Sequence, residues 1–138
     1  MTEVNITVED VQTGKENTFV KLVTIVGQLD ESNVDEKSTM IYELISKTPA
    51  NLSLIFNLEN LEYMNSKSIG YLTDWYGKIS SANGKMVIVK AKPNVADVLQ
   101  VVGLTQLIPI FNSLEEAKFA VLNDAPATPE APAAAPQA

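Results

Sequence analysis

The chain opens with alternating apolar and polar residues and then changes to longer apolar runs. Residues 4–8, Val-Asn-Ile-Thr-Val, alternate, which predicts a strand with one buried face. Residues 19–26 are apolar at most positions, so this segment is predicted to be a central strand. Turn-forming residues at 13–17 join the two as a hairpin. Three further apolar runs predict strands: 52–56, 86–89 and 107–111.

Between these strands, apolar residues recur at the three- and four-residue spacing of helices that bury one side. Asp30 and Ser32 are the expected start signals of the first helix, and Gly103 is the expected stop signal of the third. Helices are predicted over residues 33–47, after a turn at 65–68, over 94–102, and from a cap at Ser113.

The second predicted helix carries the only tryptophan and follows the turn Asn65-Ser66-Lys67-Ser68. On a helical projection, Trp75 falls at the boundary of the apolar side. Gly70 and Gly77 share one edge, a spacing that permits close approach by a neighbouring backbone. The side chains predicted to face the core are Ile69, Leu72, Tyr76 and Ile79, and those predicted to point away are Tyr71, Asp74 and Lys78.

Alternation of strands and helices after the hairpin predicts right-handed crossovers and parallel pairing. We therefore expect an α/β domain over residues 1–122, with a mixed, mostly parallel sheet of about five strands and four helices. Sites in such sheets lie at the carboxyl ends of the strands, where loops 27–32 and 60–68 are expected. Residues 123–138 are rich in proline and alanine and contain no large apolar side chain, which predicts a disordered tail.

The composition excludes several classes of function. A net charge of −7 argues against nucleic acid or an anionic membrane as partner. The chain has no cysteine and no histidine, which removes thiolate chemistry, the commonest general base and the commonest metal ligand. Neither a signal peptide nor an apolar run of about 20 residues is present, so we expect a cytoplasmic protein.

Two sets of polar residues remain as candidates for chemistry. The carboxylates of Asp30, Glu59, Glu62 and Asp74 could pair as acid and base or bind a metal, but no spacing singles out two of them. Solvated surface is the better interpretation of these residues. The turn at 65–68 is either a helix cap alone or a site that recognises a phosphoryl group. Neither a phosphate-binding glycine loop nor a base for a serine nucleophile occurs, so we expect no enzyme, cofactor or metal.

Several short signatures follow one another between residues 19 and 122. A strand ends in Gly-Gln-Leu-Asp at 27–30, and LSLIFNLENLEYMNSKSIGYL follows at 52–72. Asn-Gly-Lys-Met-Val-Ile-Val at 83–89 and Val-Val-Gly-Leu at 101–104 complete the series. In this order they resemble a STAS domain, and most closely the bacterial anti-sigma-factor antagonists.

The resemblance implies a partner switch without chemistry of its own. In that family the unphosphorylated antagonist binds an anti-sigma factor that is also a serine kinase of the histidine-kinase-like ATPase fold. Phosphorylation of one serine at the start of the second helix breaks the complex, and a phosphatase resets it. That serine corresponds to Ser66, and Asp30 matches an acidic position beside it; Ser68 is a second candidate acceptor.

The turn departs from the family pattern, which is usually Asp-Ser-Ser/Thr-Gly. Here only the serine of that pattern is retained, and Lys67 could neutralise part of a phosphate. The departure motivates an alternative, a scaffold subunit bound constitutively to the ATPase of a transport complex or to a sensory assembly. In either case we expect a monomer or weak dimer. The predicted partner surface consists of Asp30, Asn65, Ser66, Lys67, Ser68, Ile69, Tyr71 and Trp75.

Overall fold

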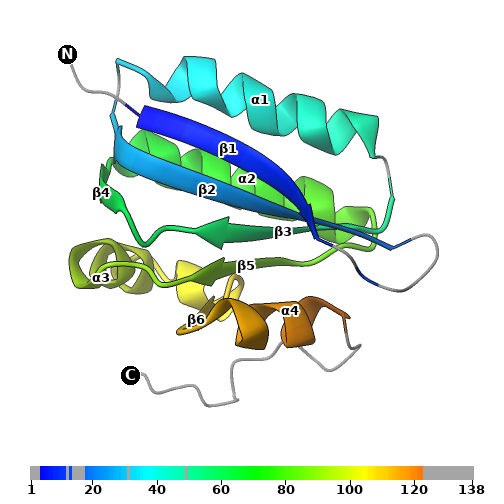
Figure 1. The fold of residues 1–138 in the computed structure, drawn as a ribbon. Helices are drawn as coiled ribbons and strands as arrows, with labels where there is room; N and C mark the ends of the chain where they lie inside the picture. The colour runs from blue at the N-terminus through cyan, green and yellow to red at the C-terminus, as the bar shows by residue number, and fades with distance from the viewer. Residues whose placement is uncertain (1–3, 12, 14–17, 31, 49, 123–138) are drawn as a thin grey trace.

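The computed structural model describes residues 4–122 except 12, 14–17, 31 and 49, and shows a sheet with helices on both faces (Figure 1). Its strands are β1 (Val4–Val11), β2 (Phe19–Leu29), β3 (Leu52–Asn57), β4 (Leu61–Met64), β5 (Met86–Val89) and β6 (Ile110–Phe111). Its helices are α1 (Val34–Lys47), α2 (Ser66–Ser81), α3 (Pro93–Val101), the 3-10 helix η1 (Leu104–Gln106) and α4 (Leu114–Leu122).

The sheet is mixed and mostly parallel, which confirms the predicted fold class. Its order is β1-β2-β3-β5-β6, and β4 pairs with β2 beyond the end of β3. The β1–β2 pair is antiparallel, and the other pairs are parallel. The described residues therefore form six strands where about five were expected.

Two cores lie on opposite faces of the sheet because β3 and β5 alternate their buried side chains between them. The larger core contains Phe56 and Ile88 and is covered by α1, α2 and α3. The smaller contains Ile55 and Val87 and is covered by α4. The apolar runs of these two strands reflect burial on both faces, as expected for central parallel strands.

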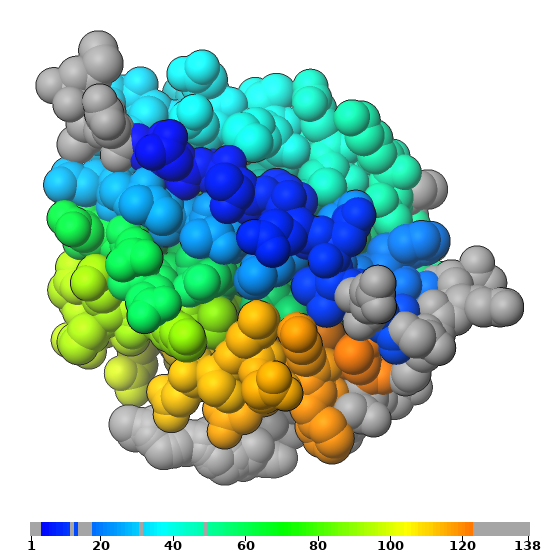
Figure 2. Space-filling view, in the orientation of Figure 1, coloured from blue at the N-terminus to red at the C-terminus, as the bar shows by residue number. Residues whose placement is uncertain are grey.

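One part of the sheet carries no helix. Figure 2 shows β1, in dark blue, open to the viewer between α1 and the segment that includes α4. The exposed side chains of β1 that alternate with its core-facing residues are polar: Asn5, Thr7 and Glu9. A solvated sheet face of this kind is ordinary for an antiparallel edge pair.

Local chemistry accounts for several element boundaries. Ser113 Oγ accepts a hydrogen bond from the backbone N–H of Glu116 at 3.2 Å, so Ser113 caps α4 as predicted. Gly84 follows α2 at a point where a Cβ atom would lie 1.8 Å from the carbonyl oxygen of Leu52. Gly103 has a φ of 80°, the left-handed conformation expected of a helix-terminating glycine.

Some predicted boundaries were wrong. The loop expected at 60–68 contains β4, and the strand expected at 107–111 is reduced to Ile110–Phe111 after η1. The first two strands continue to Val11 and Leu29 because they pair over a longer stretch than their apolar pattern indicates. The predicted tail at 123–138 and most of the turn at 13–17 lie outside the described residues. Within the described part of the chain, no helix has both the length and the hydropathy needed to cross a membrane.

Candidate partner-binding site at the start of α2

Strand pairing brings the two candidate loops together. Leu29 at the end of β2 is paired with Met64 at the end of β4, so Asp30 and Asn65 each follow directly from paired residues. A hydrogen bond of 3.0 Å from the Gly27 N–H to the Asn60 carbonyl fixes the start of the same pairing. The expectation that both loops emerge at the carboxyl edge of the sheet is therefore confirmed.

Asn65 caps α2. Its side-chain oxygen accepts hydrogen bonds from the backbone N–H of Ser68 at 2.9 Å and from the Ser68 hydroxyl at 2.7 Å. Ser68 is only 1% exposed, whereas Ser66, the first residue of the helix, is exposed. A kinase could therefore reach Ser68 only if the first turn of α2 opened, and Ser66 is the accessible hydroxyl of the pair.

Asp30 forms its hydrogen bonds within its own loop and with the start of α1. Its carboxylate accepts hydrogen bonds from the backbone N–H of Ser32 at 2.9 Å and from the Ser32 hydroxyl at 2.6 Å. Its carbonyl oxygen accepts from the N–H groups of Asn33 and Val34 at the start of α1. The structure thus places Asp30 near the start of α2, in a loop whose side chains organise the beginning of α1.

The residue that connects the two helices is Asp35, an exposed residue in the first turn of α1. Its carboxylate accepts a hydrogen bond from Lys67 Nζ at 2.9 Å and another from the Tyr71 hydroxyl at 2.5 Å. The Lys67 and Asp35 side chains are 50% and 57% exposed, so the ion pair is well solvated. The hydrogen bond from Tyr71, followed by the interaction with Lys67, holds the pKa of Asp35 below its ordinary value.

A second contact of the same kind lies further along the two helices. The Tyr42 hydroxyl of α1 donates a hydrogen bond to Asp74 of α2, and Lys78 Nζ lies 5.8 Å from the centre of the Tyr42 ring. Burial, and then the hydrogen bond to Asp74, raise the pKa of Tyr42 to about 12. Tyr71, Asp74 and Lys78, predicted to point toward solvent, therefore all have partners across this helix pair or within its aromatic cluster.

That cluster explains why Trp75 is buried. Its ring stacks on Phe56 of β3 at 5.7 Å between centroids and on Tyr71 at 6.0 Å, and Tyr42 meets it edge-on. Trp75 is 3% exposed, so its predicted boundary position was wrong, and Tyr71 is half-buried. The helical projection missed this arrangement because the Tyr42 side chain of α1 covers part of α2 that a single helix would leave exposed. We therefore do not assign Trp75 to a partner surface in this conformation.

One strip of the solvent-exposed side of α2 is lined by small residues, and we call it the small-residue face. Ser66, Gly70, Thr73 and Gly77 are all exposed and follow one another at helical spacing. A methyl group added at either glycine would meet no atom within 4 Å. Nothing in the described fold therefore requires glycine at these two positions.

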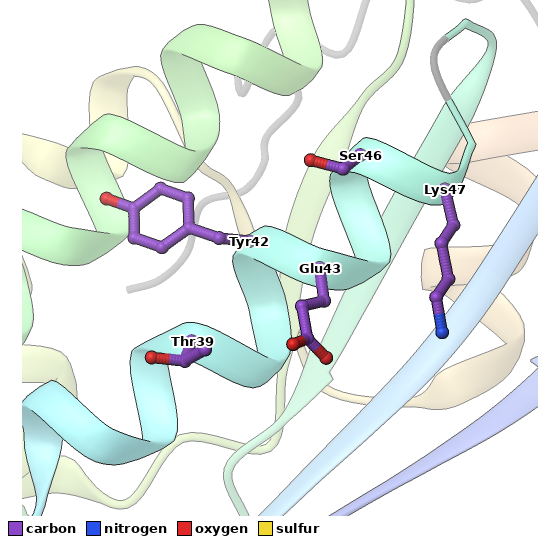
Figure 3. Close-up of a pocket in the computed structure, with 5 residues that line it drawn as sticks. All are labelled: Thr39, Tyr42, Glu43, Ser46 and Lys47. Atoms are coloured by element: carbon purple, nitrogen blue, oxygen red, sulfur yellow. The ribbon is translucent and has the colours of Figure 1, made fainter.

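No small-molecule or metal site is evident in the described part of the chain. An open hollow of about 430 Å³ is lined by residues of α1 alone (Figure 3): Thr39, Tyr42, Glu43, Ser46 and Lys47. Ligand pockets usually gather polar groups from several elements, and this hollow does not. No group of three or more acidic side chains that could hold a metal occurs among the described residues.

The sequence profile of the STAS domain family matches residues 12–117, and the chain belongs to that family. The anti-sigma F factor antagonist of Paenibacillus polymyxa is 27% identical over 94 residues, covering 68% of this chain and 80% of that protein.

Solved structures of the same fold include an anti-sigma factor antagonist from Mycobacterium paratuberculosis. It has a TM-score of 0.75 at 21% identity, and the match covers 88% of this chain and 96% of that one. The antagonist SpoIIAA in its unphosphorylated form matches with a TM-score of 0.68 at 21% identity, over 83% of this chain and 94% of that one. SpoIIAA from Bacillus in its phosphorylated form matches with a TM-score of 0.62 at 21% identity, over 82% and 96%.

Proposed function

We propose that this protein is an anti-sigma-factor antagonist, a non-enzymatic cytoplasmic regulator that binds its partner through the start and exposed face of α2. The partner is an anti-sigma factor with serine kinase activity and the histidine-kinase-like ATPase fold. It phosphorylates Ser66, the complex separates, and a phosphatase restores the binding form.

The accessibility of Ser66 carries this proposal. It is an exposed hydroxyl at the first position of a capped helix, and the neighbouring Ser68 is buried. A phosphate there would add about −1.5 to −2 charges to a packed contact. The free protein would tolerate that charge, because a helix N-terminus favours anions. The family membership and the names of the relatives point in the same direction.

The small-residue face of α2 supplies the rest of the proposed contact. Gly70 and Gly77 allow a partner backbone to approach α2 closely, and the face begins at Ser66. A charge introduced at Ser66 would therefore enter the interface at one end. Asp30 and Asn65 border the same end through the β2–β4 pairing.

A phosphorylation assay with the cognate anti-sigma kinase tests the switch. We expect the wild-type chain and Ser68→Ala to incorporate one phosphate and Ser66→Ala to incorporate none. Equal incorporation into Ser66→Ala, or none into the wild type, would remove Ser66 as the switch residue. Ser68→Ala is the matched control, because it removes a hydroxyl two residues away.

The second candidate function is a scaffold subunit that stays bound to its partner, such as a transport ATPase or a sensory complex. The turn Asn65-Ser66-Lys67-Ser68, with Lys67 paired to Asp35, favours it, because the family's usual residues around the serine are replaced. The two functions differ in their response to Ser66→Asp. The switch predicts that this variant loses partner affinity by well over tenfold, that is, by more than about 1.4 kcal/mol of binding free energy. The scaffold predicts almost no change.

A further inference from the structure

Lys67 lies beside Ser66 in the sequence and is held by α1 in this structure. Its ammonium group contacts Asp35 at 2.9 Å, and both side chains are about half-exposed. Exposed ion pairs of this kind contribute little and exchange readily. Asp35 also keeps the hydrogen bond from Tyr71, so its carboxylate would remain bonded if Lys67 moved away.

We infer that Lys67 is the counter-ion of the Ser66 switch and that Asp35 holds it in the unphosphorylated state. Phosphorylation exchanges the Lys67–Asp35 ion pair for a contact between Lys67 and the phosphate. This inference rests on the proposed switch and adds the residues that set its strength.

Charge and reach favour the exchange. A phosphoserine dianion carries more charge than one carboxylate. Adjacent helical side chains diverge, but the four-carbon stem of lysine and the added length of the phosphate span that divergence. The carboxylates contributed by neighbouring elements at this edge, Asp30, Asp35, Glu36 and Glu62, act on the phosphate in the opposite sense. They raise the second pKa of the phosphate, whereas an ammonium group lowers it.

The exchange changes which pKa Lys67 affects, that of Asp35 or that of the phosphate. In the unphosphorylated protein, Lys67 lowers the pKa of Asp35, so its removal raises that pKa. In the phosphorylated protein, Lys67 has left Asp35, and its removal raises the pKa of the phosphate instead. Titration of the phosphate and of the Asp35 carboxyl therefore shows which of the two groups Lys67 contacts in each state.

The experiment uses the full chain with phosphoserine installed at position 66 during synthesis, so that no kinase is needed. Phosphorus NMR titrates the phosphate, and carbon NMR titrates the Asp35 carboxyl, in the wild type, Lys67→Gln and Lys78→Gln. We expect Lys67→Gln to raise the phosphate pKa by roughly half a pH unit. Lys78→Gln is the matched control, because it removes the same charge at a position about 18 Å along α2 from Ser66. We expect it to change the phosphate pKa very little.

For Asp35, we expect Lys67→Gln to raise the pKa in the unphosphorylated chain and to have no such effect in the phosphorylated chain. Two results would overturn the inference: a phosphate pKa unchanged by Lys67→Gln, or an equal Asp35 shift in both forms. Because the phosphate is installed directly, neither result depends on whether a kinase recognises Ser66. The phosphorylation assay decides that question separately.

Discussion

Gly70 and Gly77 occupy solvent-exposed positions in the interior of α2, where glycine weakens a helix. Glycine in such a position is usually explained by close packing or a left-handed backbone, and neither applies at these residues. A partner that packs closely against α2 would explain why Gly70 and Gly77 have no side chain. The proposed contact is therefore marked by two glycines that the fold itself does not require.

We predict that Gly70→Ala and Gly77→Ala each stabilise the free protein by about 0.5–1 kcal/mol. The same changes weaken partner binding, because the added methyl groups keep the partner backbone away from α2. Urea unfolding measures the first effect, and calorimetric titration with the partner measures the second. Stabilised variants that bind with wild-type affinity would show that this face of α2 lies outside the interface.

Tyr42 gives a second residue-scale prediction, in the alkaline range. The folded protein keeps the Tyr42 proton up to about pH 12, whereas an unfolded tyrosine releases it near pH 10. The stability that Tyr42 contributes is therefore complete below about pH 10 and is lost as the pH rises through 12. Ultraviolet titration should show a tyrosinate transition near pH 12 that is missing in Tyr42→Phe. If Tyr42→Phe has the same alkaline transition, that transition belongs to another group, and burial together with the hydrogen bond to Asp74 does not raise the pKa of Tyr42 to about 12.

At the scale of elements, the turn after α2 requires the backbone of Gly84 to lie directly against the backbone of β3. Gly84 lies against β3, where the Leu52 carbonyl occupies the space that a side chain would need. We predict that Gly84→Ala destabilises the fold by about 2–4 kcal/mol, because backbone on both sides must shift. Urea unfolding measures the change in the free energy of unfolding. The control is Gly77→Ala in the same helix–turn segment, which is expected to stabilise the protein. A Gly84→Ala protein as stable as the wild type would mean that the turn relaxes easily.

The sequence predicts the fold class well because its strongest signals are long apolar runs. The segments 52–56 and 86–89 are correctly assigned to strands, and Ser113 is correctly assigned to a helix boundary. The turn expected at 65–68 instead contains the first residues of α2, which Asn65 caps. β4 is missed because its four residues are buried only at the two ends and do not alternate. Its pairing with β2 includes a register shift after Gly27, which no local pattern reports.

The contact between α1 and α2 is beyond single-helix patterns. Asp35, Lys67 and Tyr71 each look like solvated residues on their own helices, and they meet only because the two helices lie side by side on the sheet. Trp75 is misplaced for the same reason, since its cover comes from Tyr42 on the other helix. Sequence therefore locates the start of α2 and Ser66, while the residues that connect that site to α1 require the structure.

At the scale of the whole molecule, charge provides two routes by which a phosphate could break a complex. The chain already carries −7, so an added phosphate could act by general repulsion between acidic surfaces. Alternatively, it could act within the contact, through steric conflict and the cost of burying its charge. Salt distinguishes these routes, because the screening length is about 8 Å at 0.15 M and falls as salt is added.

The position of Ser66 at the end of the small-residue face favours the local route. We predict that the affinity lost on phosphorylation, or in Ser66→Asp, changes by less than about threefold when salt rises from about 0.15 M to 0.5 M. Thr7 is exposed on β1, so Thr7→Glu adds a charge outside the proposed contact, and we expect it to leave affinity near the wild-type value at both salt concentrations. Calorimetric or optical binding measurements with the partner provide the comparison. If Ser66→Asp regains wild-type affinity at high salt, general charge repulsion weakens the complex. If its loss of affinity persists at high salt, the added charge acts locally at the start of α2.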